Sequence, residues 1–467
     1  MTITPARPRT HTPGKRRHRV PAPPRHAISL LPDPAPNPAT DLTPDSESSA
    51  RHLTASTDLP ARHASAVATT RSRRAAAEPR SRRAPARRTY LRSALLRCAL
   101  YLGPLSVAVA AAEPLGRVAW PVPIAALLLG WSAAQALTST GAAVARHAGP
   151  SAAARLVGYG FSAVSALWCA LVWVAPAALV GPERGLALVI GLGGLASLAT
   201  VTAALVTRSE AALAGWSLPC WLLAAATLAG LAGESVADEL PIGTLLPAAI
   251  VVATVRAFRP VVIPGLRGRM PRPTGAELRR GGMFGVIGAS QAICVGLLWQ
   301  AGPSGSTAPF WLPLLLAVPI LEALIGWHTD QVDAGLDTTT DQAGYRKHVR
   351  GVTLITLAGL LPPLAVGVAL AVGAYQLPAD DGEDVLGLAG GTLLGGVFAV
   401  TFLLAARGRT GLAATLAAAP PLAVLALPIL PLPAAGPLPD AVAVLAATHL
   451  AGLLVVTMTA ADDQRTP

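Results

Sequence analysis

The sequence contains few residues that could carry chemistry, because its apolar segments hold almost no ionisable groups. Glu322 lies in the run LPLLLAVPILEALIGW, and His449 lies in LAATHLAGLL. Gln135 and Gln291 add neutral hydrogen-bonding side chains to two other apolar runs. Polar groups in such runs are expensive in hydrocarbon, which makes them functional candidates. We expect these four side chains to line a polar cavity between helices.

Two of these candidates also have a purely structural interpretation. Glu322 lies five residues before Trp327, about 8 Å from the predicted helix end at 1.5 Å per residue. It either takes part in proton- or substrate-linked movement or leans toward the cytoplasmic interface. His449 has the same functional interpretation, and its alternative is a hydrogen bond between two helices.

A row of aspartates follows the run that contains Glu322. Asp330, Asp333, Asp337 and Asp341 are spaced by 3, 4 and 4 residues, which places them on one face of a helix extending into the cytoplasm. This acidic face either pairs with a basic surface or is simply solvated. The row lacks the glycine and the twelfth-position glutamate of an EF-hand loop, so we expect no metal there.

The cysteines do not indicate a redox or metal site. Cys98, Cys169, Cys220 and Cys294 fall in four different apolar segments and form no CxxC pair. Isolated cysteines in such segments are most simply small buried hydrophobes. The predicted external loops are about ten residues or fewer, which argues against a membrane glycosyltransferase with its sizeable external acidic site. We therefore expect neither enzymatic activity nor a cofactor.

Long apolar runs must position these residues. Hydrophobic residues make up 52% of the 467 residues and charged residues only 13%, outside the range of soluble globular proteins. Each run can cross a hydrocarbon core of about 30 Å as a helix. The sequence therefore predicts an all-α, multi-pass membrane protein of about twelve spans in two six-helix halves. The predicted spans are 94–112, 118–145, 156–180, 185–207, 211–232, 240–258, 282–301, 309–327, 351–374, 385–406, 410–430 and 438–460.

Charge divides the chain into parts. We predict a first half at 93–255, a second half at 282–461 and a short cytoplasmic tail at 462–467. Between the halves, residues 256–281 form a cytoplasmic hinge, because each of its arginines would cost at least about 2.5 kcal/mol in hydrocarbon. The hinge arginines are Arg256, Arg259, Arg267, Arg269, Arg272, Arg279 and Arg280.

The segment 1–92 precedes the first span and is predicted to be a disordered cytoplasmic tail, because it has no apolar run able to form a core. It holds 18 Lys and Arg residues and six Asp and Glu residues, a net +12 that equals the charge of the whole chain. Basic segments beside a membrane attract anionic lipid headgroups, which we expect to be the partner of this tail. Nucleic acid is not expected, because Tyr90 is the only aromatic residue there.

Glycines in the tenth predicted span repeat every four residues. Gly387, Gly391 and Gly395 therefore share one helix face, and small residues at this spacing let helix backbones approach closely. We predict that this face packs against another helix.

The second predicted span and the loop after it carry a family resemblance. The stretch Gln135-Ala136-Leu137 through Ala145-Arg146 and Gly149 resembles the corresponding region of the multidrug/oligosaccharidyl-lipid/polysaccharide flippases, a group that includes MATE-type exporters. The resemblance implies a twelve-helix transporter that exports an amphipathic or lipid-linked substrate. The sequence departs from the pattern because it lacks the first-span or seventh-span carboxylate of many MATE exporters. A cavity lined by Glu322, Gln135, Gln291 and His449 would favour transport.

The alternative function is a membrane scaffold that transports nothing and recruits anionic lipid or a partner protein through its basic tail. Dry packing of the four polar candidates against other helices would favour this scaffold. For either function we expect a cell-membrane protein with both termini in the cytoplasm.

We predict that Val236 and Asp381 lie outside the cell and that Gly268 lies in the cytoplasm. The predicted cytoplasmic segments after residue 92 carry 16 Lys and Arg residues, whereas the external side has only Arg117 and Arg184. Single cysteines at the three positions, in a chain without its natural cysteines, test this with a membrane-impermeant maleimide on intact cells. Labelling at position 268, or none at 381, contradicts the predicted orientation.

Overall fold

The structure is a computed structural model that describes residues 84–231, 240–262, 272–302, 311–339, 341–427 and 436–460. The predicted tail up to residue 83, Arg267, Arg269 and the C-terminal tail at 462–467 lie outside the described residues. The description that follows concerns the helices from Pro85 onward, which belong to one compact unit.

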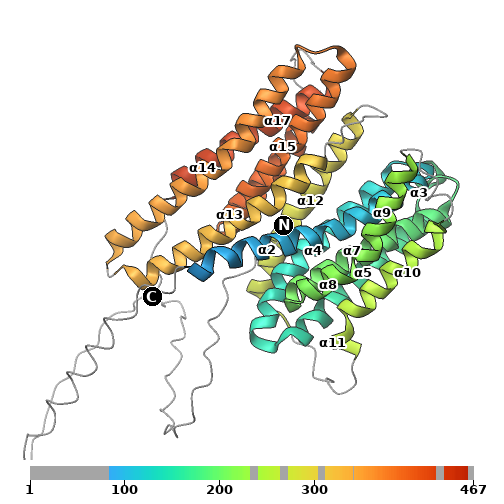
Figure 1. Cartoon of the computed structure of the whole chain (residues 1–467), viewed down its shortest axis with the longest axis horizontal. Coiled ribbons are helices and arrows are strands. Elements are labelled where there is room, and N and C mark those ends of the chain that lie inside the picture. Colours follow the sequence, from blue (N-terminus) through green and yellow to red (C-terminus); the bar gives the residue numbers. More distant parts are fainter. Residues whose placement is uncertain are drawn as a thin grey trace, which may run out of the picture. The chain divides into compact units, whose positions relative to one another are not determined.

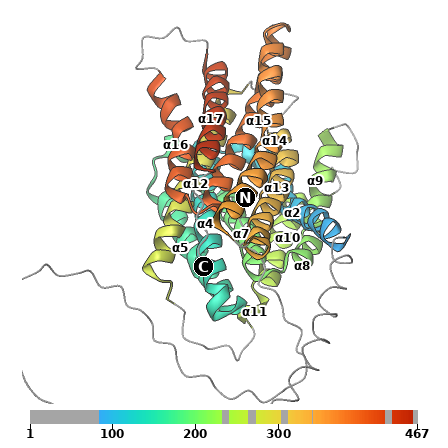
Figure 2. The ribbon, with the colours of Figure 1, turned by 90° about the vertical axis from the view of Figure 1, so that its left-hand side faces the viewer.

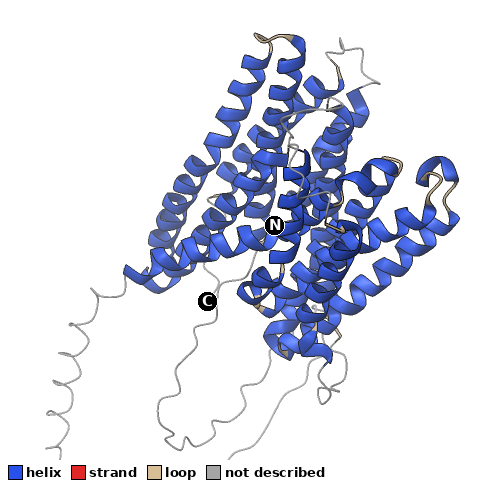
Figure 3. Ribbon diagram, turned by 45° about the vertical axis from the view of Figure 1, so that its right-hand side comes forward, coloured by secondary structure: helices blue, strands red, loops and turns tan. Residues whose placement is uncertain are grey.

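Helices account for all the regular structure within these ranges (Figure 3). The first part of the chain forms α2 (Ala84–Ala110), α3 (Ala112–Arg117), α4 (Pro121–Ala148), α5 (Pro150–Val174), α6 (Ala177–Val180), α7 (Arg184–Thr207), α8 (Glu210–Trp216), α9 (Leu218–Leu231), α10 (Ile242–Ala257) and α11 (Arg259–Val262). The second part forms α12 (Gly275–Ala301), α13 (Trp311–Thr338), α14 (Gln342–Ala374), α15 (Ala379–Ala406), α16 (Thr410–Ala426) and α17 (Pro437–Thr459).

Many of these helices are suited to a lipid bilayer. Among the described residues, seven helices are long and apolar enough to cross a membrane, and the α8–α9 pair, bent by 42°, makes an eighth if it is one span. Shorter apolar helices lie at Leu95–Ala110, Ile242–Ala257 and Thr410–Ala426. The chain is therefore a multi-pass α-helical membrane protein.

The helix boundaries differ from the predicted spans where capping residues act. The predicted span 156–180 crosses Pro176, but α5 ends at Val174 because a proline cannot continue the helical hydrogen bonds. Before the seventh span, Thr274 accepts a hydrogen bond from the Glu277 N–H, and the Glu277 carboxylate accepts one from the Thr274 N–H. This capping box starts α12 at Gly275, within the predicted hinge.

In the first part, α4, α5 and α7 pack against one another through glycines. A side chain at Gly130 of α4 would meet Leu198 of α7, and one at Gly160 of α5 would meet Leu137 of α4. Gly191 of α7 similarly faces the Trp168 ring of α5. A glycine on each helix thus makes room for a bulky side chain of another helix. Such close packing stabilises helix association in a bilayer, because lipid chains are as apolar as leucine and the hydrophobic driving force is absent.

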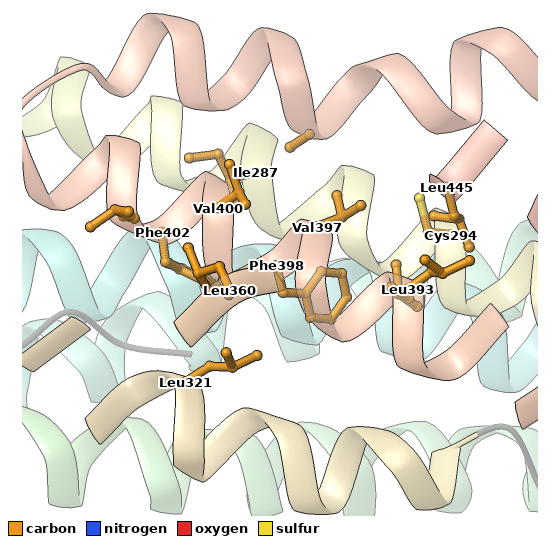
Figure 4. Close-up of a cluster of buried hydrophobic side chains, with 14 of the residues drawn as sticks. Ile287, Cys294, Leu321, Leu360, Leu393, Val397, Phe398, Val400, Phe402 and Leu445 are labelled. Carbon is orange, nitrogen blue, oxygen red and sulfur yellow. The ribbon is translucent and has the colours of Figure 1, made fainter. Parts of the chain in front are cut away.

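The second part is built around α15, which packs against α13, α14, α16 and α17. Leu393, Val397 and Phe402 of α15 lie in the buried cluster of Figure 4, with Leu321 of α13 and Leu445 of α17. One buried cluster contains only residues between 100 and 258, and another only residues between 283 and 456.

The glycines of α15 face different neighbouring helices. A Cβ at Gly395 would lie 3.1 Å from Cβ of Ala317 on α13. A Cβ at Gly387 would have no atom of the described residues within 4 Å, although this glycine is buried. The tightest fit is at Gly396, where an added methyl would overlap the His449 ring of α17.

We predict that Gly396→Ala destabilises the helical unit and that Gly387→Ala does not. Overpacking a buried contact costs about 1–3 kcal/mol, and His449 cannot move aside because it is completely buried. At Gly387 the new methyl has room, and alanine is the better helix former. Apparent melting temperatures of the purified variants, compared with the natural chain, measure both effects. Equal melting temperatures for the two variants contradict the predicted contact between α15 and α17.

Candidate functional site

The two parts of the chain meet most extensively along α4 and α12 (Figures 1 and 2). The helices run antiparallel, with Gly281 opposite Thr140 at one end of the contact and Gly296 opposite Ile124 at the other. The contact extends from Gly281 to Gly296 of α12, 15 helical rises or about 22 Å at 1.5 Å per residue. We call this contact the α4–α12 seam.

Glycines of α12 allow the close approach. A Cβ at Gly288 would lie 2.9 Å from the backbone oxygen of Trp131 and 2.9 Å from Cγ of Gln135. A Cβ at Gly285 would lie 3.5 Å from Cβ of Ala136, an ordinary contact. At the middle of the seam a backbone atom of α4 therefore faces α12 directly, and at one end a Cβ at Gly281 would overlap the Thr140 hydroxyl.

Polar side chains occupy the same middle region. The indole Nε1–H of Trp131 donates a hydrogen bond of 2.9 Å to Oε1 of Gln291. Gln135 and Gln291 are both buried, with exposed fractions of 4% and 2%. The structure thus brings together two of the four predicted candidates in one contact between α4 and α12.

One polar group of the seam lacks a partner. The Nε2 amide of Gln291 is buried and has no hydrogen bond within the part of the chain that the structure describes. An unpaired buried donor costs about 1–3 kcal/mol. The packed seam is therefore less stable than its shape complementarity alone would make it.

A charged pair lies at the end of the seam near the predicted cytoplasmic side. Nδ1 of His147, at the end of α4, lies 3.8 Å from Oε1 of Glu277 in the first turn of α12. The His147 side chain is 48% exposed and the Glu277 side chain 21%, so the pair contributes at most about 1 kcal/mol when the histidine is protonated.

His449 lies away from the seam. Its ring is completely buried beside Gly396 of α15, and the backbone of Leu360 in α14 interacts with it. Neither ring nitrogen has a hydrogen bond of good geometry to the described residues. The structure therefore places His449 in a contact between three helices of the second part, apart from Gln135 and Gln291.

The remaining acidic candidates lie along α13 and directly after it. The backbone of Glu322 belongs to α13, and its side chain lies outside the described parts. Asp330, Asp333 and Asp337 lie on α13 as predicted, but the helix ends at Thr338, so Asp341 does not continue their face. Asp341 instead caps α14, where its carboxylate accepts a hydrogen bond of 3.3 Å from the Gly344 N–H. Burial, followed by the carboxylates of Asp330 and Asp337, raises the pKa of Asp333.

The described arginines of the predicted basic hinge lie on several different helices or next to them. Arg256 lies in the last turn of α10, Arg259 begins α11, Arg272 precedes α12, and Arg279 and Arg280 lie in α12. The Arg256 guanidinium lies 4.2 Å from the centre of the Trp216 ring at the end of α8.

No group of three or more possible metal-ligating side chains occurs among the described residues.

A small cavity lies beside α2 in the first part. Its lining includes Pro104 of α2, Ser197 and Thr200 of α7, and Cys220 of α9. Its volume of about 20 Å³ is close to that of a single water, too small for an organic substrate.

Sequence reasoning missed Trp131, Gly288 and His328. The spacing of Gly281, Gly285 and Gly288 is the signal that could have identified the α12 face of the seam. For His328 no sequence signal exists, because its partner Thr356 lies on α14. The Thr356 hydroxyl donates to the Val352 carbonyl, so it accepts the 2.8 Å hydrogen bond from His328 Nδ1.

Comparisons with known proteins give structural matches only; no family model and no curated protein matches the sequence. A MATE protein in complex with MaD3S is 12% identical, with a TM-score of 0.49 over 80% of this chain and 95% of that one. An outward-facing multidrug resistance MATE family transporter of the MOP superfamily is 13% identical, with a TM-score of 0.45 over 80% of this chain and 91% of that one. The structural matches to MATE family transporters therefore extend over about 80% of the chain, as the sequence resemblance predicted. At these identities the likeness concerns the fold and assigns no substrate.

We predict that Gly288→Ala separates α4 from α12, whereas Gly282→Ala leaves the seam intact. The Gly288 methyl would press against the Trp131 backbone, which cannot rotate away, but Gly282 is exposed and has no atom within 4 Å of a Cβ. We expect a stability loss of about 1–3 kcal/mol for Gly288→Ala alone. Tryptophan fluorescence of Trp131, isolated by replacing the other tryptophans, should change for that variant only. An unchanged spectrum contradicts the packed seam.

Proposed function

We propose that this protein is a transporter that exports an amphipathic or lipid-linked substrate and that the α4–α12 seam opens during its cycle. The observation that supports this most directly is the polar middle of the seam. Trp131, Gln135 and Gln291 are buried there, and one amide group of Gln291 has no hydrogen bond among the described residues. Opening would let water or substrate reach these groups.

The packing of the two parts is consistent with such movement. The two largest buried clusters share no residue, and one holds residues up to 258 and the other residues from 283 onward. Two separately packed bodies joined along one long contact can shift with little change inside either body. We therefore infer that 93–255 and 282–461 act as two halves of six spans each.

The finer features of the topology belong to the same proposal. Each of the twelve predicted spans coincides with a helix or with the α8–α9 pair, which supports twelve crossings. The charge distribution supports cytoplasmic termini in the cell membrane. The tail at 1–92 would contact anionic lipid headgroups, and Glu322 remains the candidate for proton coupling.

The scaffold alternative is also supported by an observation. Gln135, Gln291 and His449 are all buried in helix contacts, the arrangement expected of a protein that transports nothing. The two functions differ in whether the seam ever admits water. That difference can be measured without knowing the substrate.

We predict that Gln291→Cys, in a chain without its natural cysteines, reacts with a membrane-impermeant maleimide. In a static scaffold a position with 2% exposure stays unlabelled, whereas an opening seam exposes it. The double variant Ala136→Cys with Gly285→Cys provides a lock, because the Cβ atoms lie 3.5 Å apart, within the range of disulfides. Oxidation of this pair should suppress labelling at position 291, and reduction should restore it.

Matched controls separate opening from unfolding. Ala136→Cys with Gly282→Cys should form no disulfide, because Gly282 faces away from α4. Leu298→Cys, a buried position of α12 packed against Gly390 of α15, should stay unlabelled throughout. The same lock should stop efflux of a neutral amphipathic dye from vesicles, or flipping of a fluorescent lipid between their leaflets. An unlabelled position 291 under all conditions contradicts the transporter and leaves the scaffold.

A further inference from the structure

Helices α8 and α10 lie beside each other (Figure 1). An arginine of α10 stacks on an aromatic ring of α8 there. Arg256 lies in the last turn of α10, and its guanidinium carbon lies 4.2 Å from the centre of the Trp216 ring. A cation above an indole face is attracted by the ring quadrupole. Trp216 therefore restrains a long side chain that would otherwise sample many rotamers.

The stacked guanidinium keeps its hydrogen-bonding edge free. The N–H groups of a guanidinium lie in its plane, so a ring against its face leaves them directed outward. Arg256 is exposed, and no hydrogen bond or ion pair of its side chain occurs among the described residues. Such an edge matches two oxygens of a phosphate group.

The helices beside this arginine carry exposed apolar side chains. Val252 and Val255 of α10 are exposed, as are Leu218 and Leu222 of α9. In a membrane protein these side chains contact lipid chains, and tryptophan is typical of the depth where chains meet headgroups. A fixed positive group next to lipid-facing apolar surface fits a molecule with an anionic head and hydrocarbon chains.

We propose that Arg256 and Trp216 form a binding site for the phosphodiester headgroup of an anionic glycerophospholipid. The lipid chains would lie along the exposed valines of α10 and leucines of α9. Since α10 ends on the predicted cytoplasmic side, where anionic lipids are abundant, the lipid comes from the inner leaflet. Arg259, three residues further along and exposed, adds positive charge at the same helix end. The proposal rests on the orientation proposed above and not on transport.

The site differs from a general attraction of lipid to positive charge. A diffuse basic surface attracts anionic lipid equally well through lysine or arginine, whereas a stacked and bidentate site needs the planar guanidinium. Arg350 provides a matched control, because it is also an exposed arginine at the predicted cytoplasmic end, in α14, and no ring lies against it among the described residues.

The test measures lipid retained by the full-length protein. Native mass spectrometry after mixing with phosphatidylglycerol, or with phosphatidylcholine of the same chains, counts bound lipids. We expect Arg256→Gln to weaken phosphatidylglycerol binding about fivefold. Arg256→Lys should weaken it measurably, and Trp216→Leu about two- to fivefold. Trp216→Phe should retain most of the binding, and phosphatidylcholine binding should not change.

Four outcomes would overturn the site. If Arg256→Lys binds like the natural chain, or if Arg350→Gln loses as much binding as Arg256→Gln, general charge attraction explains the lipid. If Arg256→Gln changes nothing while its melting temperature and elution are those of the natural chain, no lipid site exists there. If soluble glycerol phosphate displaces the lipid, the site takes a free phosphate and the lipid assignment is wrong. The seam-labelling experiment is independent of these outcomes, because Gln291 lies on α12, whereas the proposed lipid site lies on α8, α9 and α10.

Discussion

Close approach of helix backbones through glycine is the constraint on which the rest of this structure depends. Lipid chains are as apolar as leucine, so burying leucine between helices gains little, and helices associate where small residues admit a neighbour. Gly130, Gly160 and Gly191 join three helices of the first part in this way. Gly288 joins that part to the second, and Gly396 admits His449. Because each notch is shaped for one partner, the helix order is specified by fit and not by hydrophobicity.

Hydropathy and charge were enough to predict the helical membrane fold, because every long apolar run became a helix or a bent pair. Boundaries were less predictable, since α12 begins at a capping box that hydropathy does not detect. The contacts were least predictable. Gln135 and Gln291 were recognised as polar residues within apolar runs, but their meeting with Trp131 depends on the register between α4 and α12. Gly387 fits the spacing for close packing, yet within the described residues no atom lies within 4 Å of a Cβ at this position.

The seam combines two opposing contributions to the free energy of the packed state. Shape complementarity along α4 and α12 favours closure, and the hydrogen bond between Trp131 and Gln291 adds to it. The Nε2 amide of Gln291 has no hydrogen bond to the described residues and opposes closure by about 1–3 kcal/mol, since water would satisfy it in an open state. The weak pair between His147 and Glu277 does not alter this balance much. A contact with such opposing terms is suited to having two states.

A ligand can shift such an equilibrium only by binding one state better than the other. In the closed seam the side-chain amides of Gln135 and Gln291 are buried, so a ligand cannot form hydrogen bonds with them. In an open seam the same amides become hydrogen-bonding groups on an otherwise apolar wall. A substrate with an apolar body and a neutral polar group would therefore favour the open state. A fully charged substrate would find no counter-ion among the polar side chains of the seam, so we expect the seam to discriminate against it.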